Sequence, residues 1–188
     1  MVRIVIIHGW EGKPSSNWFP WLREELETRG VTVEVPQMPN TEHPKKNEWV
    51  SYLSNVIGEP DVHTFLIGHS LGGITILRYL ESLEGKRIGG AVLVAGFSQS
   101  LPNRKAFVEL DTFFTAPVNF ARVRRSVTKQ FIAIHSDNDP YVPILNGEIF
   151  REKCGAKLII IHNGGHLNAS DGYVQFPEAL LALESLMV

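Results

Sequence analysis

The stretch Gly68-His69-Ser70-Leu71-Gly72 decides how the chain is interpreted, because it places a serine between two glycines where an apolar run changes into a helical pattern. Residues 62–67 are apolar and rich in types that favour strands. Beyond the stretch, apolar side chains recur at the spacing of one helix face, at Ile74, Leu77, Leu80 and Leu83. A serine at such a corner takes a strained backbone conformation, in which side chains two residues to either side would collide. Because Gly68 and Gly72 avoid that collision, the stretch predicts a nucleophile elbow.

The rest of the chain repeats this alternation of apolar runs and helical patterns. Strands are predicted at residues 2–7, 31–35, 63–67, 90–94, 131–135 and 157–161, and their nearly continuous apolar character indicates burial on both faces of a parallel sheet. Helices are predicted at residues 19–29, 47–57, 70–83, 144–153 and 177–186. We therefore expect one α/β domain over residues 1–188, a doubly wound sheet of about six mainly parallel strands with helices on both faces.

The segment 97–129 departs from this regularity, because it joins two predicted strands through a stretch too long for a plain connection. It contains two prolines and several aromatic residues, among them Phe107, Phe113, Phe114 and Phe120. One interpretation is a small cap whose aromatic side chains line a substrate pocket. The other is an ordinary crossover helix with its apolar face in the core, and aromatic spacing alone does not separate the two.

Composition excludes several classes of protein. The chain has 188 residues, 44% of them hydrophobic, and a net charge of -2, so it carries no field that would attract nucleic acid or an anionic membrane. We interpret the small basic cluster of Arg122, Arg124 and Arg125 as a solvated face. The single Cys154 cannot form an internal disulfide, and Met1-Val2-Arg3-Ile4 leads into a strand and does not resemble a signal peptide. We expect a cytoplasmic protein without a membrane span.

A serine hydroxyl is a weak nucleophile, so catalysis needs an imidazole base and a carboxylate that fixes the imidazole's tautomer. Asp139 follows the predicted strand 131–135, and His166 follows the predicted strand 157–161. Ser70, Asp139 and His166 thus occur in the order Ser, Asp, His that is typical of α/β-hydrolases. The carboxyl ends of parallel strands meet at one sheet edge, where we expect all three side chains.

Each loop offers an alternative residue. Asp137 precedes Asp139 by two positions, but Asp139-Pro140-Tyr141-Val142-Pro143 resembles the acid loop of α/β-hydrolases, in which the carboxylate precedes a Val-Pro by three residues. A capped turn would explain either aspartate without catalysis. His162 adjoins its strand and is expected to pack or bond locally, whereas His166 follows two glycines that can project it over the sheet edge. Asp171 is a further alternative acid, and His69 is interpreted as structural.

Two backbone N–H groups are also needed to stabilise the oxyanion that forms during acyl transfer. We predict the amide of Leu71, directly after the serine, and the amide of Trp10 in the loop His8-Gly9-Trp10-Glu11-Gly12 after the first strand. The Trp10 and Trp18 side chains either line an acyl pocket or pack in the core.

With His8-Gly9, the elbow, Asp139-Pro140 and Gly165-His166 in this order, the chain resembles a compact α/β-hydrolase over nearly its whole length. The stretches Asn17-Trp18-Phe19-Pro20-Trp21-Leu22, Met38-Pro39-Asn40, Gly96-Phe97 and Gly164-Gly165-His166 are similar to those of the small YdeN-like serine hydrolases, which are related to retinoblastoma-binding protein nine. The resemblance implies Ser70 as nucleophile, Asp139 as orienting acid and His166 as general base.

The sequence thus predicts a serine hydrolase of carboxylesterase type that cleaves a small ester or amide substrate through an acyl-enzyme. No metal or organic cofactor is implied, because the histidines lack zinc-binding spacing. Cyanohydrin cleavage and cofactor-free peroxidation use the same triad and stay open. So does a protein-interaction module with a vestigial site, which would have a protein partner.

Overall fold

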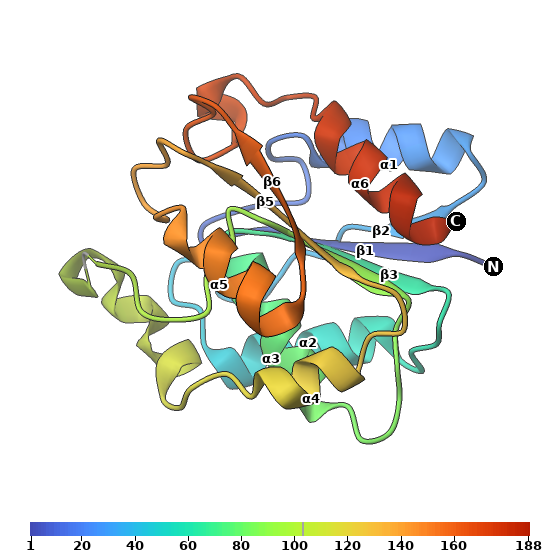
Figure 1. Ribbon diagram of the computed structural model, residues 1–188, viewed down its shortest axis with the longest axis horizontal. Coiled ribbons are helices and arrows are strands. Elements are labelled where there is room, and N and C mark those ends of the chain that lie inside the picture. The colour runs from blue at the N-terminus through green and yellow to red at the C-terminus, as the bar shows by residue number, and fades with distance from the viewer. Residues whose placement is uncertain (103) are drawn as a thin grey trace.

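The structure is a computed structural model that describes residues 1–102 and 104–188, the side chains of residues 104–107 excepted. Within these residues six strands form one parallel sheet in the order β2-β1-β3-β4-β5-β6 (Figure 1). The strands are β1 Arg3–Ile7, β2 Thr32–Glu34, β3 Thr64–His69, β4 Gly90–Val94, β5 Phe131–Ser136 and β6 Lys157–Ile161. The predicted parallel α/β sheet is therefore confirmed.

Helices cover both faces of this sheet. Helices α1 (Phe19–Thr28) and α6 (Pro177–Met187) lie on one face, and α2 (Lys46–Ile57), α3 (Leu71–Ser82), α4 (Phe120–Arg125) and α5 (Leu145–Cys154) lie on the other (Figure 1). Successive strand side chains point to opposite faces, so Ile4 and Ile6 of β1 join the core under α1 and α6. Val5 and Ile7 join the core under α2 and α3.

Burial on both faces holds for the four inner strands only. Every residue of β3, β4 and β5 is buried, and so is all of β1 after Arg3. The expectation is wrong for β2 and β6, where Thr32 and Lys157 are exposed and Ile160 keeps 42% of its surface. These strands form the two edges of the sheet, so each has a strand neighbour on one side only.

The segment 97–129 contains the 3₁₀ turns η1 (Arg104–Phe114) and helix α4. It is fixed to α3 by the nearly buried Arg78, whose guanidinium donates to the Phe113 carbonyl at 2.7 Å and to the carbonyl of Ala116. Phe113 is fully buried and meets the Trp49 ring edge-on at 6.1 Å. The side chain of Phe107 lies outside the described residues.

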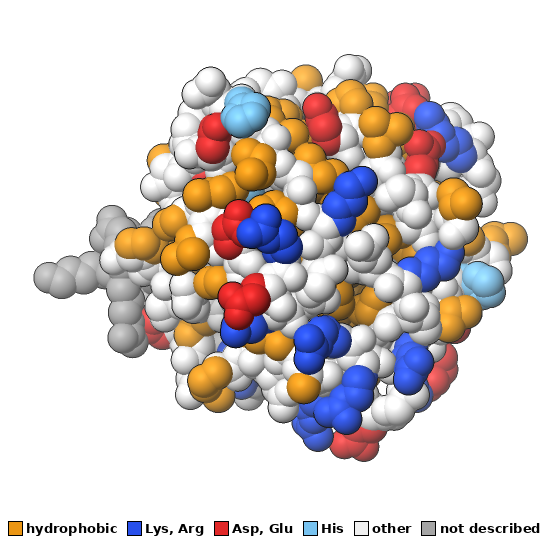
Figure 2. Space-filling model, viewed as in Figure 1, with side chains coloured by type: hydrophobic (Ala, Val, Ile, Leu, Met, Phe, Trp, Pro, Cys, Tyr) orange, Lys and Arg blue, Asp and Glu red, His pale blue; other side chains and the backbone are white. Residues whose placement is uncertain are grey.

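The surface carries charges of both signs. Arg122, Arg124 and Arg125 are all exposed on or beside the outer face of α4, and Figure 2 shows basic side chains over this region with acidic ones among them. In the part of the chain that the structure describes, we find no helix with both the length and the apolar character that a membrane span requires.

Candidate active site

Ser70 occupies the corner between β3 and α3 in a strained backbone conformation. Its φ is 55° and its ψ is -117°, a region that costs a residue other than glycine about 1–3 kcal/mol. Two backbone hydrogen bonds hold the corner: Ser70 N–H donates to the Val94 carbonyl, and Gly73 N–H donates to the Ser70 carbonyl, each at 2.9 Å. The corner presents the serine at the carboxyl edge of the sheet.

The glycines around Ser70 sit where a side chain would meet backbone. A Cβ at Gly68 would lie 2.5 Å from the Gly72 carbonyl carbon. A Cβ at Gly72 would lie 2.2 Å from the Ile7 oxygen, so the end of β1 requires a glycine at that position. Gly9, in the loop after β1, would place a Cβ 3.1 Å from the Cβ of Ser70. These approaches bring the loop after β1 against the serine.

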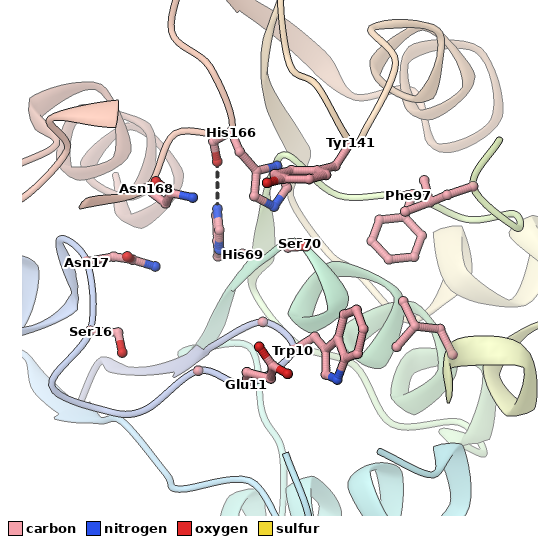
Figure 3. Close-up of a pocket in the computed structure, with 14 residues that line it drawn as sticks. Trp10, Glu11, Ser16, Asn17, His69, Ser70, Phe97, Tyr141, His166 and Asn168 are labelled. Carbon is pink, nitrogen blue, oxygen red and sulfur yellow. Dashed lines mark hydrogen bonds between the residues drawn. The ribbon is translucent and has the colours of Figure 1, made fainter. Parts of the chain in front are cut away.

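Asp139 and His166 form a buried pair in the loops after β5 and β6. The Nδ1 of His166 lies 2.7 Å from Oδ2 of Asp139, and only 11% of the histidine side chain and 1% of the aspartate side chain are exposed. Oδ1 of Asp139 accepts hydrogen bonds from the N–H groups of Tyr141 and Val142, at 2.8 and 2.9 Å. Because the carboxylate accepts from Nδ1–H, the lone pair of the imidazole is on Nε2. His166 and Ser70 line the same cavity (Figure 3).

Asp137 and His162 form a second pair that faces solvent. Their Nδ1 and Oδ2 atoms are 2.6 Å apart, with 81% of the histidine and 39% of the aspartate side chain exposed. The register of β5 with β6 pairs residues 25 positions apart, and Asp137 and His162 simply continue that register. The Asn163 N–H, together with His162, holds the pKa of Asp137 below its ordinary range. Neither side chain lines the cavity that contains Ser70.

Asp171 and His69 hold the backbone of His166. Asp171 Oδ2 accepts from the His166 N–H at 2.7 Å, so this carboxylate bonds the main chain and Asp139 bonds the ring. His69 Nε2 donates to the His166 carbonyl at 2.9 Å, which fixes the neutral tautomer of His69. Burial lowers the pKa of His69 to about 3. The sequence indicated a structural His69 but not this partner, which is 97 residues away.

Further hydrogen bonds join the two loops that carry Asp139 and His166. Ser136 Oγ accepts from Gly164 N–H at 2.9 Å, and Asn138 Oδ1 accepts from Gly165 N–H at 2.8 Å. Ser136 Oγ also donates to Asn138 Oδ1 at 2.6 Å. These hydrogen bonds hold the Asp139–His166 pair in one geometry.

His8 holds the loop after β1 in place through two hydrogen bonds. Its Nδ1 donates to the Gly9 carbonyl at 2.8 Å, and its Nε2 accepts from the Met38 N–H at 3.0 Å. Because Nε2 accepts a hydrogen bond, the ring is neutral, and burial lowers the pKa of His8. Of the two residues whose amides were predicted to bind the oxyanion, Trp10 lines the cavity together with Ser70. Leu71 is the first residue of α3, and an N–H group at that position has no acceptor within its own helix.

Trp18 is a core residue. Its side chain is fully buried between Phe19 and Phe176, and its indole N–H donates to the Leu167 carbonyl at 3.0 Å. Of the two interpretations offered for the tryptophans, pocket lining therefore applies to Trp10 and core packing to Trp18.

The cavity beside Ser70 has a volume of about 420 Å³, within the usual range for small-molecule sites. Its walls include three polar residues to which the sequence assigned no role in the site, Ser16, Asn17 and Asn168, beside apolar side chains from the segment 97–129. Among the described residues no three His, Cys, Asp or Glu side chains are grouped to hold a metal ion.

The fold and this site define the α/β-hydrolase class. The model of the serine hydrolase family matches residues 4–185, and the chain belongs to that family. It is 33% identical to YdeN of Bacillus subtilis (strain 168) over 93% of this chain and 90% of that protein. The YdeN crystal structure superposes with a TM-score of 0.93, at 31% identity over 99% of this chain and 98% of the other.

Two more distant proteins are also similar to this chain. The serine hydrolase RBBP9 of Rattus norvegicus is 23% identical over 90% of this chain and 86% of its own length. The monoacylglycerol lipase of Paleococcus ferrophilus has a TM-score of 0.70 at 17% identity, covering 98% of this chain and 93% of the other. At that identity the likeness shows the fold alone.

Proposed function

We propose that the protein hydrolyses carboxylic esters through an acyl-enzyme, with Ser70 as nucleophile, His166 as general base and Asp139 as the carboxylate that orients His166. The observation that carries the proposal is the buried Asp139–His166 hydrogen bond of 2.7 Å at the cavity that Ser70 lines. Membership of the serine hydrolase family supports hydrolysis.

In the first half of the reaction Ser70 Oγ attacks the ester carbonyl carbon as its proton passes to Nε2 of His166. The carbonyl oxygen becomes an oxyanion, which the N–H groups of Trp10 and Leu71 stabilise. When the carbon–oxygen bond to the alcohol breaks, the imidazolium of His166 returns the proton to the leaving alcohol. Asp139 stabilises that imidazolium throughout.

In the second half water takes the place of the alcohol. It attacks the acyl-enzyme while His166 accepts its proton, and the bond between Ser70 Oγ and the acyl carbon breaks. The proton returns to Ser70, and the carboxylic acid leaves. His69 and Asp171 hold the backbone of His166 in place while its ring gains and loses the proton.

Labelling with a fluorophosphonate probe tests the activated serine without a guess at the substrate. We expect the label on the peptide that contains Ser70 and its loss in both Ser70→Ala and His166→Ala. His162→Ala is the matched control, because His162 sits in the exposed pair and should leave labelling unchanged. Absence of label on the folded wild-type protein would contradict the proposal and favour an interaction module.

A further inference from the structure

The cavity beside Ser70 has two chemically different sides. Asn17, Asn168 and Ser16 lie together on one side of Ser70, and Glu11 lies beside Trp10 (Figure 3). Trp10 and Phe97 lie on the other side of Ser70 (Figure 3), and the apolar side chains of Leu101 and Leu110 also line the cavity. A substrate that fills the cavity therefore spans a polar and an apolar half, with its reacting carbonyl between them.

Hydrogen bonds fix which end of each asparagine faces the cavity. Oδ1 of Asn17 accepts from the Ala169 N–H at 3.0 Å. Oδ1 of Asn168 accepts from Ser170 Oγ at 2.6 Å and from the Asp171 N–H at 3.2 Å. Since backbone N–H groups only donate, both amide oxygens are committed to the turn behind them. The Nδ2 ends of both side chains point toward the middle of the cavity (Figure 3).

The polar groups that line the cavity thus combine donors with an acceptor. The two carboxamide groups present N–H donors, and the Glu11 carboxylate only accepts when ionised. A hydroxyl group both donates and accepts, so it can bond to either kind of partner. A carboxylate ligand would meet the like charge of Glu11, and an ammonium ligand would meet the donors of both asparagines. The combination favours an uncharged ligand with several hydroxyl groups.

We propose that the polar side binds the alcohol part of a polyhydroxylated ester, such as a glyceryl or sugar ester, and that the apolar side binds its short acyl chain. This inference rests on the proposed function. The alcohol is assigned to the polar side because His166 must protonate it. Asn168 follows His166 by two residues, and Asn17 bonds the same turn through Ala169. A cavity of about 420 Å³ suits a short acyl group.

A pair of butyrate esters tests the alcohol side directly. 1-Glyceryl butyrate and n-propyl butyrate share the acyl group and the three-carbon alcohol and differ only in two hydroxyl groups. We expect wild-type kcat/KM to be about tenfold higher for the glyceryl ester, as two added neutral hydrogen bonds would give. Equal values for the two esters, or a higher value for choline butyrate than for glyceryl butyrate, would overturn the inference.

Two variants test whether the asparagines cause the preference for the glyceryl ester. Asn168→Ser keeps a capping oxygen for the turn and removes the amide donor. Asn17→Asp keeps Oδ1 for Ala169 and tolerates the positive φ of 54° at this position. We expect each to lower kcat/KM for the glyceryl ester about fivefold and to change the propyl ester less than about twofold. Asn55→Ser, on the exposed side of α2, is the control and should change neither value.

A loss of equal size on both esters would show that the asparagines only support the fold of the turn, and the inference would be wrong. Fluorophosphonate labelling separates this failure from failure of the proposed function. A protein that labels at Ser70 but ignores the hydroxyl groups refutes the alcohol site alone. A protein that neither labels nor hydrolyses either ester refutes both.

Discussion

Asp139→Asn tests whether the Asp139–His166 pair carries the chemistry, in contrast to the exposed Asp137–His162 pair. Its effect follows from the hydrogen bonds of Asp139. Oδ1 accepts from the N–H groups of Tyr141 and Val142, so an asparagine must keep its oxygen at that position. Its NH₂ group then replaces Oδ2 and faces Nδ1 of His166, 2.7 Å away. Facing a donor, Nδ1 must become the acceptor, which moves the histidine proton to Nε2. That tautomer cannot take the proton of Ser70.

We expect the wrong tautomer to lower kcat about ten-thousandfold, the usual size of this change in a Ser-His-Asp triad and equivalent to about 5.4 kcal/mol. The fold should survive, because asparagine is isosteric with aspartate and both backbone hydrogen bonds to Oδ1 are kept. Initial rates of 4-nitrophenyl acetate hydrolysis measure the loss, and circular dichroism checks the fold.

Asp137→Asn is the matched control. It makes the same substitution two residues away, in the exposed pair with His162, and should change kcat less than about twofold because exposed ion pairs contribute little. A large loss in Asp137→Asn with little loss in Asp139→Asn would refute the reasoning. Equal losses in both would show that the joined loops act as one unit and that no single pair carries the chemistry.

Two further predictions concern stability. Gly72→Ala should lower the free energy of unfolding, measured in urea, by about 3 kcal/mol or more, because the added methyl carbon would lie 2.2 Å from the Ile7 oxygen. Gly30→Ala is the control: its φ is 77° but the space around it is open, so it should lower the free energy of unfolding by only about 1–2 kcal/mol. Equal losses in the two variants would contradict this reasoning. Burial lowers the pKa of His69 to about 3 and that of His135 to about 4. In the unfolded chain a histidine has a pKa of about 6.5, so between about pH 7 and about pH 5 only the unfolded state takes up these protons. Lowering the pH over this range should therefore reduce the free energy of unfolding by about 2 kcal/mol for each histidine. His135→Leu should halve that loss in urea titrations at the two pH values, and an unchanged loss would show that His135 does not titrate in this range.

The inner sheet could be predicted from the sequence because strands buried on both faces must be apolar throughout. Within it, residues 90–94 were predicted with the bounds that β4 has, and at the edge of the sheet residues 157–161 were predicted with the bounds of β6. Burial of β6 was predicted wrongly, because an apolar run such as Ile159-Ile160-Ile161 does not reveal that the strand lies at an edge. The short helix α4 was not resolved from its surroundings, since six residues carry little periodic signal.

The candidate site, too, could be predicted from the sequence only in part. Chain order and the ends of predicted strands indicated Ser70, Asp139 and His166, which the structure brings to one sheet edge. The bonds from His69 and Asp171 to the His166 backbone depend on how two loops meet, and no local pattern encodes that. The amide orientation of Asn17 depends on a partner 152 residues away, so it was beyond sequence reasoning.

Trapping the acyl-enzyme is the most direct test of the account. The protein is mixed with 4-nitrophenyl acetate, quenched in acid within the first turnovers and mapped by mass spectrometry of its peptides. The account predicts one acetyl group on the peptide that contains Ser70, absent from Ser70→Ala and accumulating in the first turnovers of wild type. Rapid turnover with the acetyl group on another residue, or with an Ser70→Ala variant as active as wild type, would contradict it.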